Sequence, residues 1–156
     1  MFGISVKKLK SSILAVLFGI PEDRLADEPV QWRFKAKKNY KNTYGLHITA
    51  FLKSPWYIYT EQLNHNEASL LNIEFQPNPF IAYIGKLQEI GNLIEKYDPI
   101  IKHEIRLYKV AVNFMQKVEV VFNEPTTLKG KVHYVISDGK NKLETYVQVF
   151  KITLNG

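Results

Sequence analysis

Cysteine is absent from this chain of 156 residues. Its absence excludes disulfide bonds, thiol catalysis, thiol redox chemistry and every metal site built on thiolates. The cellular compartment stays open, because a protein without thiols is stable under reducing and oxidising conditions alike. The remaining composition is that of one folded domain of ordinary size: 46% of the residues are hydrophobic, 13% aromatic and 23% charged, which argues against disorder.

The sequence motifs of common catalytic, metal and cofactor sites are also missing. The four histidines do not form an HExxH or comparable spacing, and there is no GxSxG motif and no glycine-rich phosphate loop. The adjacent acids Glu22-Asp23 and Asp27-Glu28 lie in a polar stretch, where solvation is the expected role. We therefore expect neither an enzyme nor a metal or cofactor site.

Acidic residues are outnumbered, giving a net charge of +6, but the excess is local. Residues 1–43 hold nine basic and four acidic residues, a net of +5, whereas residues 44–156 hold twelve and eleven, a net of +1. A nucleic-acid-binding protein is expected to carry a basic stripe across its folded body. The nearly neutral body predicts that this protein does not bind nucleic acid.

The first 20 residues combine a basic stretch with the apolar run Ile13–Ile20. This layout is typical of a secretory signal, although no small-residue cleavage site follows, and it is too short for a transmembrane helix of about 20 residues. The alternative is an amphipathic helix ending before Pro21. Its apolar residues recur at helical spacing at Leu9, Ile13, Leu17 and Ile20. Either way, residues 1–29 form a leader and polar linker, and residues 30–156 form the folded domain. Contact with a membrane is expected only through this segment, if it stays uncleaved.

From residue 30 onward, apolar and polar residues alternate in short segments about ten residues apart. The alternation covers 30–35, 46–49, 56–60, 73–75, 105–107, 110–114, 118–120, 132–136 and 147–149. Segments of this kind, rich in β-branched and aromatic residues, predict an all-β antiparallel sandwich. Turn residues separate them at Lys41-Asn42, Pro77-Asn78-Pro79, Asn123-Glu124-Pro125 and Ser137-Asp138-Gly139. The Asp-Gly pair predicts a hairpin before the last strand.

One stretch departs from this alternation. Between Gly85 and Asp98, apolar residues follow helical spacing at Leu87, Ile90, Leu93 and Ile94, with Gly91 as an interruption. We expect a short helix or an irregular loop here, and a long loop in a small sandwich is often functional.

Aromatic residues gather in two places that are candidate binding sites. In Trp56-Tyr57-Ile58-Tyr59, alternation sends Trp56 and Ile58 to one face and the tyrosines to the other. The tyrosines either lie at an edge or under a loop, or they form a binding surface. The run Tyr97–Ile101 likewise either clamps a loop onto the sandwich or contributes to binding.

The order of several segments resembles a known family. These segments are Val30-Gln31-Trp32, Pro55–Thr60, Glu95–Ile100, Val110–Val118 and Gly130–Val135. In this order and spacing they are similar to the N-terminal periplasmic domain of the thiol:disulfide interchange protein DsbD, in the module form of the Bacteroidetes type. The resemblance covers residues 30–154 and implies an immunoglobulin-like sandwich in the periplasm or cell envelope.

The same resemblance implies a redox site that this chain lacks. Family members receive electrons from a membrane partner and pass them to thioredoxin-like proteins through a cysteine pair, which a cap loop shields. The first cysteine falls on Ser137 and the second near Lys142, and Tyr97–Ile100 lies where the cap loop would be. Disulfide exchange needs a thiolate that attacks and a second sulfur that resolves. A serine and a lysine supply neither.

We therefore expect a non-catalytic, protein-binding or scaffold module of the cell envelope, with a thioredoxin-like or membrane DsbD-like protein as partner. Its binding residues are predicted at the former active-site end: Tyr57, Tyr59, Tyr97, Asp98, Ile100 and Asp138 within the Ser137–Lys142 hairpin. An alternative is an accessory to thiol:disulfide interchange that docks a thioredoxin-like protein supplying the cysteines. A third is a carbohydrate-binding sandwich with Trp56, Tyr57 and Tyr59 as a stacking platform.

Overall fold

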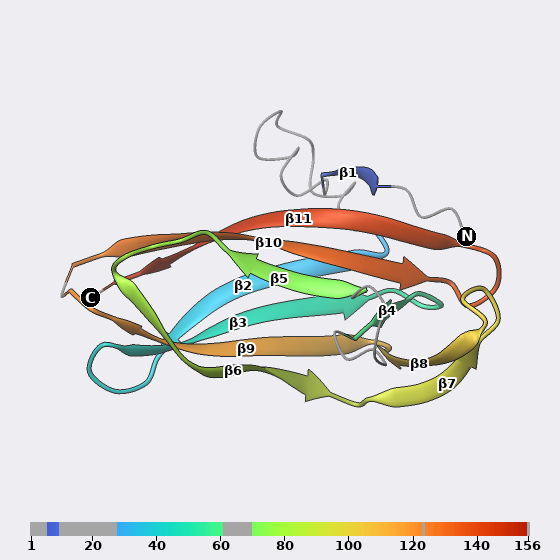
Figure 1. The fold of residues 1–156 in the computed structure, drawn as a ribbon, viewed down its shortest axis with the longest axis horizontal. Coiled ribbons are helices and arrows are strands. Elements are labelled where there is room, and N and C mark those ends of the chain that lie inside the picture. The colour runs from blue at the N-terminus through green and yellow to red at the C-terminus, as the bar shows by residue number, and fades with distance from the viewer. Residues whose placement is uncertain (1–5, 10–27, 61–69, 123, 156) are drawn as a thin grey trace.

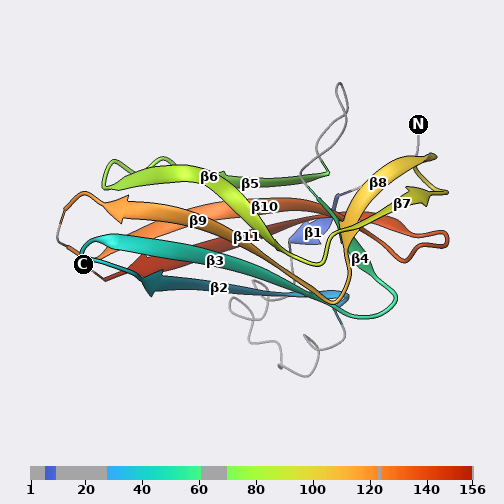
Figure 2. The same ribbon diagram turned by 90° about the horizontal axis from the view of Figure 1, so that it is seen from below.

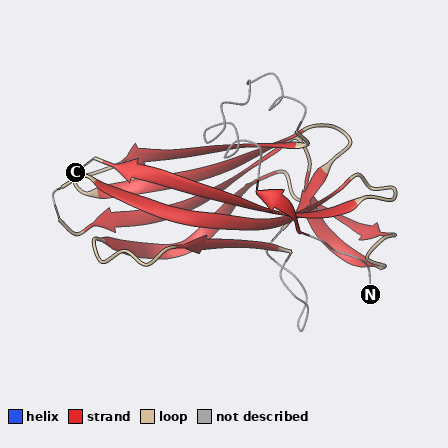
Figure 3. Ribbon diagram, turned by 90° about the horizontal axis from the view of Figure 1, so that it is seen from above, coloured by secondary structure: helices blue, strands red, loops and turns tan. Residues whose placement is uncertain are grey.

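The structure, a computed structural model, describes residues 6–9, 28–60, 70–122 and 124–155. Two sheets pack face to face in this part of the chain (Figure 1), and it contains strands and loops but no helix (Figure 3). The strands are β1 (Val6–Leu9), β2 (Val30–Lys38), β3 (Thr43–Leu52), β4 (Tyr57–Tyr59), β5 (Leu71–Phe75), β6 (Ile81–Gly91), β7 (Ile94–Asp98), β8 (His103–Tyr108), β9 (Ala111–Val120), β10 (Thr126–Ser137) and β11 (Leu143–Leu154). The predicted all-β, immunoglobulin-like sandwich is confirmed.

The smaller sheet has the order β2-β3-β9-β6, and the larger has the order β1-β11-β10-β4-β8-β7. Strand β10 divides the larger sheet into two parts. One edge of β10 pairs with β11 along its whole length, while the other edge pairs first with β5 through Gly130–Tyr134 and then with β4 through Ile136 and Ser137. Strands β4, β8 and β7 therefore extend the larger sheet at one end of the sandwich (Figure 2).

The main core lies between the two sheets. Alternate residues of β3 and β9 fill it from one side, and alternate residues of β10 and β11 fill it from the other. Leu46, Ile48 and Phe114 are fully buried in it, as are Leu128 and Leu154. Their polar neighbours along each strand face outward, as the period of two in the sequence predicts.

A second, smaller core lies at the end where β4, β8 and β7 extend the sheet. Tyr57 and Tyr59 of β4 are buried there with Ile105, Leu107 and Val135. Ile58, between the tyrosines, packs in the main core instead. The predicted division of the β4 side chains between two faces is thus confirmed, and both faces are covered.

The helix or loop expected between Gly85 and Asp98 is wrong, because this stretch forms the end of β6 and all of β7. A register shift between Ile84 and Gln88, where Gly85 has a φ of 73°, interrupts the alternation. The chain then passes from the smaller sheet to the larger one between β6 and β7. A bulge followed by a change of sheet produces a spacing of three and four residues without a helix.

Little of the N-terminal segment lies within the described residues. Val6–Leu9 forms β1, which pairs in parallel with β11 near Thr145 and Val147. The predicted signal-like run or helix over Ile13–Ile20 and the linker up to residue 27 lie outside the described residues. No helix of the described chain is long and apolar enough to span a membrane.

Candidate binding end with a buried tyrosine–aspartate cluster

Strand β4, the turn between β7 and β8, and the hairpin between β10 and β11 meet at one end of the sandwich (Figures 1 and 2). We call this region the Asp98 end. The turn between β2 and β3, which contains Tyr40, lies at the opposite end. Sequence-distant segments predicted to form the site are therefore brought together: Tyr57 and Tyr59 from β4, Tyr97 to Ile100 from β7 and its turn, and Ser137 to Lys142 from the hairpin.

The Asp98 carboxylate is the centre of this end and has no exposed surface. Its Oδ2 accepts hydrogen bonds from the hydroxyl groups of Tyr57 at 2.7 Å and Tyr59 at 2.6 Å. Its Oδ1 accepts from the backbone N–H groups of Ile100 at 2.8 Å and Ile101 at 3.0 Å. Four donors from two separate segments thus satisfy one buried charge, as a buried carboxylate requires.

These contacts determine the ionisation of the cluster. Burial alone would raise the pKa of the Asp98 carboxyl, but the hydrogen bonds from Tyr59, Ile101, Tyr57 and Ile100 outweigh burial, so the pKa lies below its ordinary value. Burial and the nearby carboxylate raise the pKa of the Tyr59 hydroxyl, and burial likewise raises that of Tyr57. At neutral pH the aspartate is charged and both tyrosines are neutral donors.

The local sequence explains the turn that holds Asp98. An aspartate followed by Pro99 favours a turn in which the side chain accepts hydrogen bonds from the backbone two and three residues later. The turn closes when the N–H of Lys102 donates to the carbonyl oxygen of Asp98 at 2.7 Å, with a φ of 62° at Lys102. The turn and β7 therefore position the carboxylate over the β4 tyrosines.

The hairpin between β10 and β11 has a similar internal cap. Asp138 Oδ1 accepts hydrogen bonds from the N–H groups of Lys140, Asn141 and Lys142 at 2.9, 3.1 and 3.0 Å. Slight burial would raise the pKa of the Asp138 carboxyl, but these backbone donors lower it below its ordinary value. Its carboxylate is thus used to order the five-residue tip, and the predicted hairpin is confirmed.

The two positions where the resemblance puts cysteines occupy different environments. Ser137 has no exposed surface, and its Oγ accepts a hydrogen bond from the N–H of Gly139 at 3.0 Å. Lys142 is exposed at the tip, and Leu143 rather than Lys142 lies directly opposite Ser137 in the strand register. This buried hydroxyl accepts a backbone N–H and is not activated as a nucleophile, since activation needs an adjacent general base.

Lys96, which the sequence did not single out as a site residue, and Gly139 of the predicted hairpin both contact the Tyr57 ring. The Lys96 Nζ lies 4.6 Å from the centroid of the Tyr57 ring, a cation–π geometry. Gly139, at a φ of 78°, lies against the same ring, because a Cβ placed on it would be 3.4 Å from Tyr57 Cε2. The Asp-Gly pair indicated the turn, but no sequence signal placed Lys96 beside a residue 39 positions away.

The predicted binding residues therefore have distinct roles. The Tyr57 and Tyr59 rings are 1% and 0% exposed, so they form the interior of this end and not an exposed aromatic surface. Tyr97 is 57% exposed on the face of β7 opposite Asp98, and Ile100 is half-buried in the turn. The exposed surface at this end is formed by Tyr97, the turn around Ile100 and the hairpin tip.

The structure removes the basis for a carbohydrate platform. Trp56 is half-buried and packs against the main core, and both tyrosines are covered. A stacking platform needs a flat, exposed aromatic surface, which these three residues do not form. Within the described ranges, no group of three or more histidine, aspartate or glutamate side chains could hold a metal ion.

The fold and this end together define an immunoglobulin-like sandwich with a buried tyrosine–aspartate cluster beneath two capped turns. The structure is similar to that of the N-terminal domain of DsbD from Neisseria meningitidis in its reduced form, with a TM-score of 0.59 and 13% identity over 91% of this chain and 94% of that one. The likeness confirms, at the level of the fold, the resemblance indicated by the sequence.

A second similar structure is the N-terminal periplasmic domain of ScsB from Proteus mirabilis, with a TM-score of 0.57 and 11% identity. The match covers 83% of this chain and 47% of the ScsB chain, so this chain spans about half of that structure. No protein-family model matches the sequence, and no curated protein matches it significantly. At these identities the two structures establish the fold, and the function must be argued from the residues.

Proposed function

We propose that this protein is a binding module of the cell envelope that uses the Asp98 end to dock a thioredoxin-like protein and performs no disulfide exchange itself. The observation that carries the proposal is the cluster of Tyr57, Tyr59 and Asp98. It joins the β7–β8 turn to β4, and Tyr57 of β4 in turn pairs with Ser137 and packs against Gly139 of the hairpin, although the chain has no cysteine. A preorganised surface binds at a lower entropic cost than a mobile one.

The exposed side chains at this end suit a protein contact. Tyr97 offers a large amphipathic ring, a side chain that is enriched at protein interfaces. Strand β7 is also the last strand of the larger sheet in the described chain, so a partner strand can add to its outer edge. The proposed partner class is the one implied by the sequence resemblance to DsbD N-terminal domains, and the fold shared with the DsbD and ScsB domains is consistent with it.

The envelope location is part of the same proposal. The ScsB domain is periplasmic by its description, and the N-terminal run Ile13–Ile20 has the layout of a secretory signal. A reporter fusion that is active only after export, joined behind residue 29, tests this directly. Reporter activity that is lost when Ile13–Ile20 is deleted supports export, and a fusion protein that is made in full but stays inactive contradicts it.

Binding is tested with immobilised protein and a panel of envelope thioredoxin-like domains. We expect Tyr97→Ala to weaken binding about tenfold or more, as for a tyrosine at the centre of an interface. The matched control is Tyr40→Ala, because Tyr40 is 72% exposed at the opposite end of the sandwich and should leave binding unchanged. Equal effects of the two variants, or no binding to any thioredoxin-like domain, would contradict the proposal.

Insulin reduction distinguishes a pure binding module from an accessory to a partner's cysteines. The chain alone should leave the rate with dithiothreitol unchanged, because disulfide exchange needs sulfur on the attacking group. When a thioredoxin-like partner is added, an unchanged partner rate supports a scaffold. An increased rate that Tyr97→Ala abolishes supports the accessory role, and activity of the chain alone contradicts both.

A further inference from the structure

Three turns form the end of the sandwich that lies opposite the candidate binding end (Figures 1 and 2). They connect β2 to β3, β5 to β6 and β9 to β10. Backbone hydrogen bonds join them, because the N–H of Val120 donates to the carbonyl oxygen of Asn42 at 2.9 Å and the N–H of Val121 donates to that of Phe80 at 2.8 Å. Side chains from all three turns therefore form one surface, which we call the Phe122 end.

Large apolar side chains are exposed on this surface. Tyr40, Phe80, Val121 and Phe122 are between 44% and 72% exposed. The Phe80 and Phe122 rings meet edge-on with their centroids 5.3 Å apart. Polar residues and glycine predominate in turns, and apolar side chains gathered on the surface of a folded protein mark an interaction site. The four residues therefore indicate a surface that contacts another molecule.

The same surface is basic. Residues 35–47, from the end of β2 to the start of β3, contain four lysines and no acidic residue. Among them, the Lys41 Nζ lies 5.3 Å from the centroid of the exposed Tyr40 ring. Seven lysines and three glutamates, a net charge of +4, belong to the strand ends and turns of the Phe122 end, which are residues 35–47, 72–84, 116–130 and 150–155. A molecule that binds here is therefore expected to carry negative charge.

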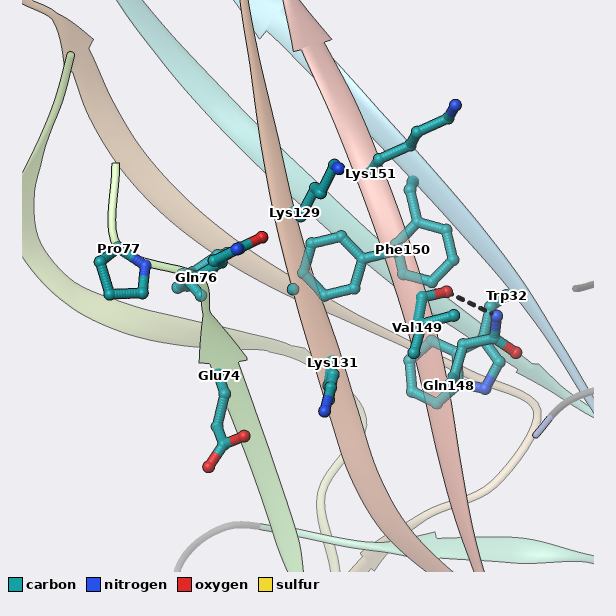
Figure 4. A pocket seen from close by; sticks show the side chains of 13 residues that line it. Trp32, Glu74, Gln76, Pro77, Lys129, Lys131, Gln148, Val149, Phe150 and Lys151 are labelled. Carbon is teal, nitrogen blue, oxygen red and sulfur yellow. Dashed lines mark hydrogen bonds between the residues drawn. The ribbon is translucent and has the colours of Figure 1, made fainter. Parts of the chain in front are cut away.

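Two of the seven lysines belong to the larger sheet. Lys129 and Lys151 lie directly opposite each other on β10 and β11 and alternate with the buried Gly130 and Phe150, so they project from the outer face of this sheet. The aromatic cavity between the sheets (Figure 4) is on the other face and is not part of the surface. Lys129 is three residues from Thr126, where β10 begins, or about 10 Å along the strand. This is about one Debye length at physiological salt, so both lysines add to the attraction of an anionic surface.

We propose that the Phe122 end docks on a membrane surface that contains anionic lipids. The apolar side chains of the three turns enter the boundary between headgroups and acyl chains, and the surrounding lysines lie against the anionic headgroups. Apolar insertion and a group of basic residues are two signals that together give stable attachment to a membrane. A second copy of this chain would bring two basic ends together, and a small soluble anion would leave the aromatic rings in water.

This attachment is compatible with protein docking but does not depend on it. The ten residues of β9 separate the two ends by about 30 Å, so a membrane at the Phe122 end leaves the Asp98 end accessible. The contact is additional to the one expected through residues 1–29. Vesicles without protein test it alone, so its failure is distinguishable from failure of the proposed function.

The first experiment measures co-sedimentation of the full chain with vesicles of phosphatidylglycerol, which is anionic, and of phosphatidylcholine, which is zwitterionic. We expect binding to the anionic vesicles that weakens as salt is added, and binding to the zwitterionic vesicles that is about tenfold weaker or more. Equal binding to the two lipids, or no binding to phosphatidylglycerol, overturns the proposal.

Charge variants test whether the lysines of the Phe122 end cause this preference. Lys38→Gln with Lys41→Gln should weaken binding to phosphatidylglycerol about twentyfold, because each lysine near a membrane surface contributes about a fivefold factor. The control, Lys53→Gln with Lys109→Gln, removes the same charge from exposed positions beyond the far ends of β3 and β9 and should have little effect. Equal weakening by the two double variants overturns the assignment to this end.

The second experiment locates the residues that enter the lipid. Phe122→Trp introduces a fluorescent probe at the proposed contact, and Phe51→Trp is the matched control at an exposed position on the outer face of the smaller sheet. Both variants keep Trp32 and Trp56 and the same N-terminal segment, so these contribute equally. Phosphatidylglycerol with brominated acyl chains should quench the fluorescence of Phe122→Trp about twofold more than that of Phe51→Trp. Equal quenching, or none in either variant, overturns the proposal.

Discussion

Asp98 is the residue whose replacement has the clearest expected consequence. Asp98→Asn keeps the size of the side chain but removes the charge that accepts from Tyr57, Tyr59 and two backbone N–H groups. Its amide nitrogen would also face donors, leaving at least one buried polar group unsatisfied. We expect a loss of about 2–3 kcal/mol in the free energy of unfolding, measured by urea denaturation at pH 7.

The charge of Asp98 also makes the stability of the protein depend on pH. Because folding lowers the pKa of the Asp98 carboxyl, its stabilisation is complete above its unfolded pKa of about 4 and is lost as pH falls through the lower folded value. The stability difference between the natural protein and Asp98→Asn should therefore be largest above about pH 5 and narrow toward pH 2. A difference that stays constant over this range would contradict a charged Asp98.

Val110 is a residue whose replacement should stabilise the folded protein, in contrast to Asp98. It has a φ of 70° in the connection between β8 and β9 and is 76% exposed. A β-branched residue in this left-handed region is strained by about 1–2 kcal/mol, and asparagine tolerates the region better. We expect Val110→Asn to raise the free energy of unfolding by about 1 kcal/mol. Val121→Asn, at another exposed valine, is the control and should change stability by less than about 0.5 kcal/mol.

At the level of elements, the close approach of β5, β10 and β11 depends on Gly130. A Cβ at this position would lie 2.5 Å from the carbonyl oxygen of Glu74 and 2.4 Å from Phe150 Cζ. Since the first contact is with backbone, a side-chain rotation cannot relieve it. Gly130→Ala should lower the free energy of unfolding by about 1–3 kcal/mol.

Gly45→Ala in β3 is the matched control for this change. A Cβ there would meet only the His47 Nε2 at 3.2 Å and more distant side-chain atoms, which can move. Alanine also restricts the unfolded chain more than glycine does, which favours the folded state. We expect Gly45→Ala to be neutral or stabilising. If both variants lost stability equally, the crowding at Gly130 would not be the cause.

The strands were predictable where alternation was undisturbed. Val30, Trp32 and Phe34 and the segment Val132–Ile136 indicated β2 and β10, because a half-buried strand needs a period of two. The prediction failed at Gly85–Asp98. A bulge in β6 shifted the period there, and the chain then changed sheets. Neither event leaves a distinct local pattern, since both depend on contacts with distant strands.

The candidate site was only partly predictable for a similar reason. Alternation placed Tyr57 and Tyr59 on one face, turn residues indicated the hairpin at Asp138, and the aromatic run Tyr97–Ile101 indicated the segment around Asp98. Sequence alone could not show that the Asp98 carboxylate binds both tyrosine hydroxyls across 41 and 39 positions. That contact buries the tyrosines and leaves Tyr97 as the exposed aromatic residue. Which residues are covered is a property of the tertiary structure.

As a whole, the molecule has a fold similar to that of the DsbD and ScsB N-terminal domains, and its Asp98 end has an ordered surface without any cysteine. The absence of cysteine removes thiol chemistry from this chain. Binding needs only the arrangement of the two turns: the Asp98 cluster holds the β7–β8 turn against β4, and Tyr57 of β4 contacts the hairpin. The account therefore predicts that docking and redox activity are separable in this protein.

NMR chemical-shift mapping with an envelope thioredoxin-like domain tests this account most directly. We predict that the shifted backbone amides cluster at residues 96–102 and 137–143 as the partner is titrated, and that the partner, with its cysteines replaced by serine, gives the same pattern. Shifts centred on the opposite end around Tyr40, or no shifts at a partner concentration in the millimolar range, would contradict the account.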